Sequence, residues 1–297
     1  QKPAEKLPTQ ASGTDLLGPK SPLAVTSLAP VPTVKATSQV ESEYPLAPDI
    51  GSTLPDETSQ QVREKLWGPY QGQGGYILKH FDRLSKNYGS QTGQDKWVDR
   101  VLGQRTGLFA VESGANDGNS YSNSLFFELN RRWECLLVEA NPGYKDVILG
   151  HHRKCHFLSG GLSMTDGISS FDFVQAGMLG GFPTTMGKAH ERRYKSELKQ
   201  GKLSKGDPGN GTTVQVKCFP LHVVMQALGR QVVDYWSLDT EGSEPDILEH
   251  TDFSKFEVGV MTVERHTAQH FKRSKIVLQK HGIRHVASEG ADDYFAS

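Results

Sequence analysis

Carboxylate, amide and glycine residues gather in three short segments, each of which directly follows an apolar run. The segments are residues 112–118 (ESGANDG), 139–142 (EANP) and 239–244 (DTEGSE). Glycine allows the backbone to come close to a ligand, and amides near the start of a helix donate hydrogen bonds to it. Carboxylates crowded at the end of a strand are costly unless they bind a ligand or take up a proton. The segments therefore predict a site for a polar small molecule.

The first segment is a turn between a strand and a helix that is expected to begin near Ser120. Its spacing departs from the dinucleotide-binding pattern Gly-x-Gly-x-x-Gly, because Asn116 stands where the second glycine would admit a pyrophosphate. No Gly-Lys-Ser/Thr follows, which excludes a Walker phosphate loop. A cofactor without phosphates fits this turn better.

Glu139 follows the second apolar run, residues 135–138. An acidic residue at the tip of the second strand of a nucleotide-binding α/β fold can accept hydrogen bonds from both hydroxyls of a ribose. Acids at two successive strand tips, Glu112 and Glu139, are more specific than either acid alone. Together they predict a nucleoside-type cofactor.

The third segment places three carboxylates within six positions after another apolar run. Glu244 is interpreted as a helix-capping residue. Asp239 lies at the strand tip itself, so a structural role explains it less well. Asp239 or Glu241 is the candidate general base, because a base must be a proton acceptor close to the reacting group.

These segments must be positioned by short strands that alternate with longer crossovers. Alternation of this kind indicates a mostly parallel sheet with helices on its faces. A four-spaced apolar stripe at Tyr121, Leu125 and Leu129 predicts the first crossover helix. The five apolar runs that predict the strands are residues 108–111, 135–138, 156–158, 232–238 and 258–263.

Composition divides the chain into three parts. Nine of the fifteen prolines lie in the first sixty residues, so residues 1–60 are predicted to be a disordered stalk or linker, with a Pro-rich docking segment as the alternative. Residues 61–106 are a helical lead-in, and residues 107–297 form the main domain. A glycine-rich and then basic stretch at about 166–212 is an insertion in that domain. Its basic residues are either a solvated helix face or a surface for an acidic substrate or partner.

The three segments, in this order and spacing, resemble the FkbM family of S-adenosylmethionine-dependent methyltransferases. The resemblance covers roughly residues 107–297 and implies a Rossmann-like class I methyltransferase fold with S-adenosylmethionine as cofactor. Within the family, the Asn-Asp-Gly form of the first turn and the Pro-rich stalk are similar to the animal group around the protein Star. Those proteins are type II membrane proteins of the early secretory pathway linked to trafficking of growth-factor ligands.

The resemblance implies roles for particular residues. Glu112, Gly114 and Gly118 shape the methionine and ribose side of the cofactor site, with Asn116 in the same turn. Glu139 holds the ribose hydroxyls, and Asp239 lies near the transferred methyl group. Two positions depart from the family pattern: Glu112 replaces the usual Asp, and Leu221-His222 replaces the usual Leu-Asp.

Two functions follow from the resemblance. The first is transfer of a methyl group from S-adenosylmethionine to an oxygen of an unknown acceptor, without a metal. The second is an inactive methyltransferase-fold module that handles secretory cargo proteins. The resemblance to Star favours the lumen of the endoplasmic reticulum or Golgi, with an anchor upstream of this chain, over the cytoplasm. The sequon Asn210-Gly-Thr212 agrees with that compartment.

Charge and hydropathy exclude other partners. The formal net charge is -1, so no overall field attracts nucleic acid or an anionic membrane, and no apolar run reaches the length of about 18 residues that a membrane span needs. The chain begins at Gln1, so membrane attachment would require a segment preceding it.

Cysteines and histidines leave alternatives open. Cys135 and Cys155 flank neighbouring predicted strands and are either a disulfide or two buried thiols, while Cys218 is free. His266 and His270 have a spacing that suits two metal ligands, but no carboxylate-rich metal pattern accompanies them, so no metal site is predicted. Glu264 and His266 follow the fifth strand and are expected to face the substrate crevice.

Overall fold

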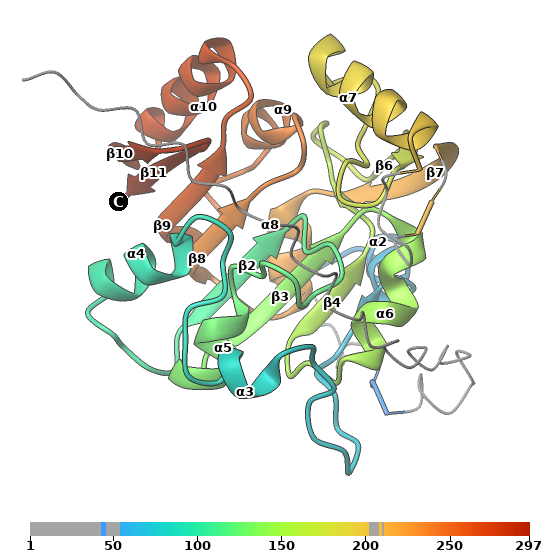
Figure 1. Cartoon of the computed structure of the whole chain (residues 1–297). Helices are drawn as coiled ribbons and strands as arrows, with labels where there is room; N and C mark the ends of the chain where they lie inside the picture. Colours follow the sequence, from blue (N-terminus) through green and yellow to red (C-terminus); the bar gives the residue numbers. More distant parts are fainter. Residues whose placement is uncertain (1–42, 46–53, 202–207, 210) are drawn as a thin grey trace, which may run out of the picture. The chain divides into compact units, whose positions relative to one another are not determined.

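The main sheet has eight strands in the order β1-β4-β3-β2-β8-β9-β11-β10 (Figure 1). The computed structural model describes residues 43–45, 54–201, 208–209 and 211–297, all within one compact unit. Strands β4, β3, β2, β8 and β9 run parallel, whereas β1 and β11 pair antiparallel with their neighbours. The strands are β1 Leu66–Trp67, β2 Phe109–Ser113, β3 Glu134–Glu139, β4 His156–Ser159, β8 Val232–Leu238, β9 Glu257–Glu264, β10 Arg284–Glu289 and β11 Asp292–Ala296.

The five parallel strands are the five predicted apolar runs, and the predicted fold class is confirmed. Strand order reverses at β2, which has β3 on one side and β8 on the other. In open α/β sheets, ligands bind beyond the carboxyl ends of the strands at such a reversal. All three polar segments begin at or directly after the ends of β2, β3 and β8.

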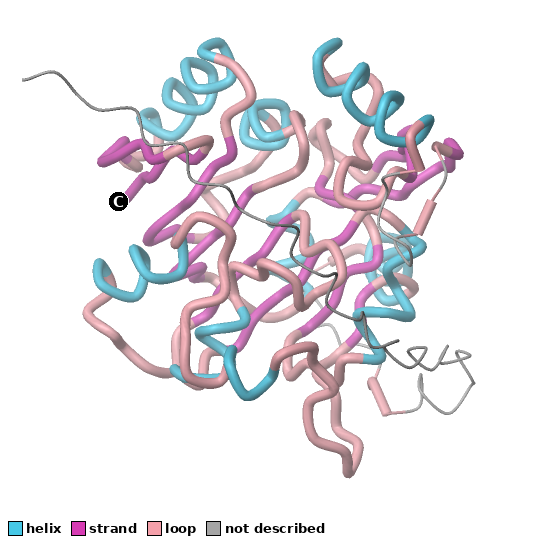
Figure 2. Tube along the Cα trace, viewed as in Figure 1, coloured by secondary structure: helices cyan, strands magenta, loops and turns pink. Residues whose placement is uncertain are grey.

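Helices cover both faces of the sheet because side chains alternate along each strand (Figures 1 and 2). Val111 and Leu136 belong to one buried apolar cluster, and Ala110 and Leu137 belong to a second. The first cluster includes side chains of α2 Asp56–Arg63, α8 Leu221–Ala227, α9 Glu244–Glu249 and α10 Ala268–Lys280, and the second includes side chains of α4 Gln94–Val101, α5 Leu125–Arg131, η1 Pro142–Tyr144 and α6 Lys145–Gly150.

The first crossover helix begins later than predicted. Helix α5 starts at Leu125, and Tyr121 lies before it, exposed and with a positive φ of 60°. The Glu112 carboxylate accepts hydrogen bonds from the backbone amides of Asn123 and Ser124, which holds this stretch as a loop. The apolar spacing indicated a helix there because it contains no signal of that buried carboxylate.

The stretch at 166–212 contributes to a second, three-stranded sheet with the order β5-β7-β6. Its strands are β5 Gly161–Leu162, β6 Ser169–Gln175 and β7 Thr212–Phe219, and helix α7 Lys188–Lys199 lies between β6 and β7 in the chain (Figure 1). Lys195 pairs with Glu191 and Arg193 with Glu197 one turn apart, as on a solvated helix face. Residues 202–207 and 210, with two basic positions and the sequon asparagine, lie outside the described residues.

Part of the predicted stalk packs on the domain. Tyr44 is 3% exposed, and its hydroxyl donates a hydrogen bond of 2.5 Å to the Leu149 carbonyl. Helix α2 begins at Asp56, so the predicted boundary at residue 60 falls inside a helix. Residues 1–42 and 46–53 lie outside the described residues. The predicted lead-in contains β1, α3 Phe81–Leu84 and α4.

No helix in the described part of the chain is long and apolar enough to cross a bilayer.

Candidate functional site

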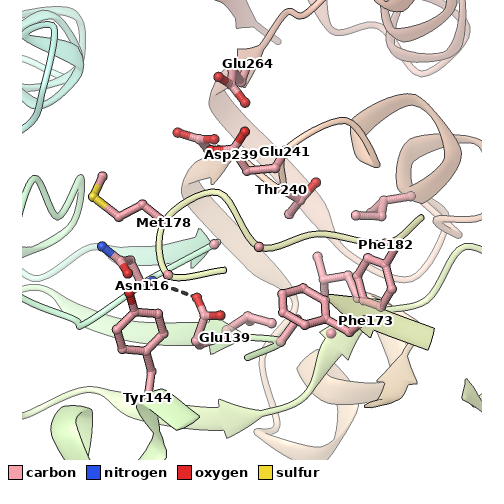
Figure 3. Close-up of a pocket in the computed structure, with 18 of the residues that line it drawn as sticks. Asn116, Glu139, Tyr144, Phe173, Met178, Phe182, Asp239, Thr240, Glu241 and Glu264 are labelled. Atoms are coloured by element: carbon pink, nitrogen blue, oxygen red, sulfur yellow. Dashed lines mark hydrogen bonds between the residues drawn. The ribbon is translucent and has the colours of Figure 1, made fainter. Parts of the chain in front are cut away.

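A cavity opens beyond the carboxyl ends of the parallel strands, beside the second sheet (Figure 3). Glu139 and Asn116 lie at one end of it, and Asp239, Glu241 and Glu264 group at the other. Apolar side chains form one wall of the cavity. Leu162 and Phe173 come from strands β5 and β6 of the second sheet, and Met178 and Phe182 come from the segment that follows β6.

Five of the predicted site residues line this cavity together: Gly114, Asn116, Glu139, Asp239 and Glu241. Glu112 and Gly118 do not line it. The structure therefore brings five of the seven predicted residues to one cavity, while their roles toward a ligand remain predictions.

Gly114 marks the closest approach between two of the polar segments. Its φ is +86°, and a Cβ atom built there would lie 1.7 Å from the Asp239 carbonyl oxygen. No other residue type fits without moving the backbone. The turn after β2 therefore lies directly against the strand tip that carries Asp239.

Glu139 is held by backbone amides on both sides. Its Oε2 accepts a hydrogen bond of 2.7 Å from the Asn116 amide, and its Oε1 accepts one of 2.7 Å from the Asn141 amide (Figure 3 shows the first). Burial raises the pKa of Glu139 to about 7, and the two amides offset only part of that effect. Each oxygen keeps a further lone pair that can accept a ligand hydroxyl.

Glu112 organises the loop that follows the glycine turn. Its carboxylate accepts hydrogen bonds from the Ser122 hydroxyl at 2.7 Å, the Asn123 amide at 2.8 Å and the Ser124 hydroxyl at 2.5 Å. The longer side chain in place of Asp thus has protein partners at both oxygens. Its effect on the cavity is through the shape of the loop.

Arg153 supports the same loop and was missed by the sequence analysis. It is 1% exposed, forms an ion pair with buried Glu128 and donates hydrogen bonds to the Gly118 carbonyl and the Ser124 hydroxyl. A lone arginine in the polar run 151–154 has the pattern of a surface residue, and only the contact of the segment before β4 with the glycine turn reveals its role.

Cys135 and Cys155 form a disulfide, with 4.6 Å between their Cα atoms. Of the two alternatives left open by the sequence, the structure has the bridge. Cys218 is free and buried.

The acidic end of the cavity combines carboxylates from two strand tips. Burial and the charge of Glu264 raise the pKa of Asp239 well above its usual range. Burial also raises the pKa of Glu241 and of Glu264, with the charge of a neighbouring carboxylate as the second cause.

Glu244 does not cap its own helix, contrary to the prediction. Its Oε1 accepts hydrogen bonds from the backbone amides of Thr240 and Gly242 in the preceding loop.

Gln91 from the lead-in, Tyr144 from η1 and Glu264 from β9 also line the cavity and were not assigned to the cofactor or catalytic set. Glu264 carried a signal, because it was expected to face the crevice at the end of the fifth strand. The other two come from segments whose motifs gave no sign of ligand contact.

The strand order and the cavity at the sheet reversal define a Rossmann-like α/β fold. The chain belongs to the FkbM methyltransferase domain family, which matches residues 112–286. Among solved structures, it is similar to precorrin-6y C5,15-methyltransferase from Geobacter metallireducens GS-15, at 12% identity and a TM-score of 0.34, over 74% of this chain and 91% of that chain. It is also similar to the METTL16 methyltransferase domain, at 10% identity and a TM-score of 0.31, over 67% of this chain and 63% of that chain. No curated protein matches the chain.

Proposed function

We propose that this chain transfers a methyl group from S-adenosylmethionine to an oxygen of its acceptor. Family membership supports an S-adenosylmethionine-dependent methyltransferase in general. The observation that carries the proposal is the single cavity in which Glu139, the Gly114 turn and Asp239 meet.

The described residues fit such a cofactor. The side-chain oxygen of Asn116 is buried in the cavity wall without a hydrogen-bond partner among them, so a ligand donor would satisfy it. Glu139 would hold the ribose hydroxyls, and Phe173 and Phe182 offer an apolar surface for the purine. When bound, the cofactor supplies a methyl group on a positively charged sulfur.

The acidic end supplies the proton acceptor that a hydroxyl acceptor needs. Asp239 and Glu241 both line the cavity. Burial raises the pKa of Glu241 to about 8, so this carboxyl group can exchange a proton near neutral pH, and burial together with the charge of Glu264 raises the pKa of Asp239 above its usual range. The backbone of Asp239 lies against the Gly114 turn, and this contact supports Asp239 as the residue beside the proposed cofactor site.

Calorimetric titration of the full chain with S-adenosylmethionine and S-adenosylhomocysteine tests the cofactor site without an acceptor. We expect micromolar binding, and Glu139→Ala should weaken it about 100-fold, because two hydrogen bonds to a charged group are worth about 3 kcal/mol. Glu134→Ala is the matched control, since Glu134 begins the same strand and its side chain is 62% exposed.

A folded wild-type chain that binds neither compound would overturn the proposal and favour the inactive cargo-handling module. Equal binding by wild type and Glu139→Ala would instead refute the assignment of Glu139 to the ribose. Circular dichroism of each variant establishes that it is folded.

We further propose that the chain works in the lumen of the endoplasmic reticulum or Golgi. The Cys135–Cys155 disulfide supports this, because such bonds persist in oxidising compartments and are rare in the cytosol. Protease protection in intact membrane vesicles tests it: a lumenal chain survives until detergent is added, whereas digestion without detergent would place it in the cytoplasm.

A further inference from the structure

Three elements bring imidazole and carboxylate groups together at the acidic end of the cavity. His190 comes from α7, Glu241 from the loop after β8, and His266 from the segment after β9. One potential ligand atom from each lies within 4.8 Å of the other two. His190 Nδ1 is 3.2 Å from Glu241 Oε2, and His266 Nε2 is 2.8 Å from Glu264 Oε2. These residues are far apart in sequence, so only the fold assembles them.

The hydrogen bonding of His190 leaves its inner nitrogen available as a ligand. Its Nε2 lies 2.9 Å from the Leu179 carbonyl oxygen, which can only accept, so Nε2 carries the hydrogen. The Nδ1 lone pair of the neutral ring then faces the Glu241 carboxylate. Two acceptors at that distance need a proton or a cation between them. Histidines that bind metals commonly donate their other N–H to a backbone carbonyl in this way.

Glu244 provides an independent sign of a missing partner. It is fully buried, and its Oε2 has no hydrogen-bond partner among the described residues. One of its carboxylate oxygens lies within 4.8 Å of ligand atoms of Glu264 and His266. A buried carboxylate oxygen without a partner is costly, and a bound cation would remove much of that cost.

The balance of charge points the same way. Asp239, Glu241 and Glu264 offer carboxylate oxygens within 4.8 Å of one another. In the described part of the chain, the ion pairs of Glu241 and Glu264 are with the two histidines. Mixed imidazole and carboxylate ligands suit transition-metal ions, whereas calcium and magnesium favour oxygen ligands alone.

We propose that His190, Glu241, His266 and Glu264 bind one divalent transition-metal cation, of the Zn²⁺ or Mn²⁺ type. Glu244 lies close enough to balance its charge. Because Glu241 and Glu264 line the cavity, the cation would lie where an acceptor oxygen binds and would make a bound hydroxyl easier to deprotonate. That last step rests on the proposed function, whereas metal binding itself does not. With Glu241 bound to the cation, Asp239 remains to take the proton.

Calorimetric titration of the full chain, stripped with chelator and free of any methyl donor, tests the site. We expect ZnCl₂ and MnCl₂ each to bind with one equivalent and to raise the melting temperature. His190→Ala and His266→Ala should each weaken binding at least tenfold, as loss of a direct ligand does. His250→Ala is the matched control, because His250 forms a similar 2.8 Å pair with Asp166 elsewhere on the domain and should leave affinity unchanged.

Three results would overturn the proposal: no heat and no shift in melting temperature with either metal up to millimolar concentration, unchanged affinity in both histidine variants, or an equal loss in His250→Ala. If a histidine variant fails to fold, Glu241→Gln keeps the side-chain size and replaces it in the test. A chain that binds metal but not S-adenosylhomocysteine contradicts the proposed function alone. A chain that binds S-adenosylhomocysteine but neither metal contradicts this inference alone.

Discussion

At the scale of single residues, Glu139 combines a structural task with a proposed ligand-binding task. Its two oxygens fix the backbone of the turns after β2 and β3. Because burial raises its pKa to about 7, it is only partly ionised at neutral pH. Ribose hydroxyls donate more strongly to the ionised form, since hydrogen bonds to a charged acceptor are stronger.

Affinity for S-adenosylhomocysteine should therefore rise between pH 6 and pH 8. If only ionised Glu139 binds, affinity falls by up to about tenfold for each pH unit below 7. The fold itself responds in the opposite direction. Since the folded pKa exceeds the usual value, the contribution of Glu139 to stability is full below about pH 4.5 and is lost as the pH rises through 7.

Calorimetry at pH 6, 7 and 8 on wild type and Glu139→Gln checks this expectation. The variant should bind more weakly and lose most of the pH dependence, because it has no carboxyl group to titrate. A flat profile in the wild type, or an unchanged profile in the variant, would show that Glu139 does not control affinity through its charge.

A site residue could be predicted from the sequence when a single strand end and the turn after it determine its position. Glu139 and Asp239 each follow an apolar run directly, and Gly114 follows the end of β2, so sequence spacing placed all three at the same edge of the sheet. Arg153 and His190 could not be found in this way. Arg153 depends on contact between the segment before β4 and the loop after β2, and His190 depends on the insertion lying beside the acidic end of the cavity.

At the scale of elements, the five parallel strands were predictable because they are largely buried and their sequences are mainly apolar. The second sheet could not be predicted from local sequence patterns. Its strand β6 (SSFDFVQ) pairs with β7 across an intervening helix, whereas the glycines and basic residues of this stretch indicated only an insertion in the domain. Sequence separation of that size hides strand pairing from local patterns.

The disulfide links the start of β3 to the segment that precedes β4, the neighbouring parallel strand. It closes a loop with a sequence separation of 20 residues, which corresponds to about 3 kcal/mol of stability through the entropy of the unfolded chain. The double variant Cys135→Ala with Cys155→Ala should lose about that amount in urea unfolding. Reductant should destabilise the wild type similarly and leave the double variant unchanged. Cys218→Ala, which removes a buried free thiol, controls for loss of packing.

An equal response of wild type and double variant to reductant would contradict a stabilising role for this bond.

At the scale of the whole molecule, segments before the predicted domain complete both core and cavity. Val62, Leu66 and Val98 are each 0% exposed and belong to the two apolar clusters of the sheet. Gln91 lines the cavity. Its neighbours Thr92 and Gln94 donate hydrogen bonds to Asp292 of the strand β11, which ties the lead-in to the end of the chain. The change of pattern near Gly107 marks the first parallel strand of the main sheet, and we expect that residues 107–297 do not form a self-sufficient unit.

A fragment of residues 107–297 should consequently fail to fold, whereas a chain of residues 43–297 should fold cooperatively. Each fully buried Val or Leu that is lost costs about 1–5 kcal/mol, and a domain has only about 5–15 kcal/mol in total. Thermal unfolding followed by circular dichroism, with dye binding to exposed apolar surface, distinguishes the two. We expect a sharp transition for the longer chain, and dye binding without a transition for the shorter one. A cooperative transition of the 107–297 fragment at a similar temperature would mean that the lead-in is not required for the domain to fold.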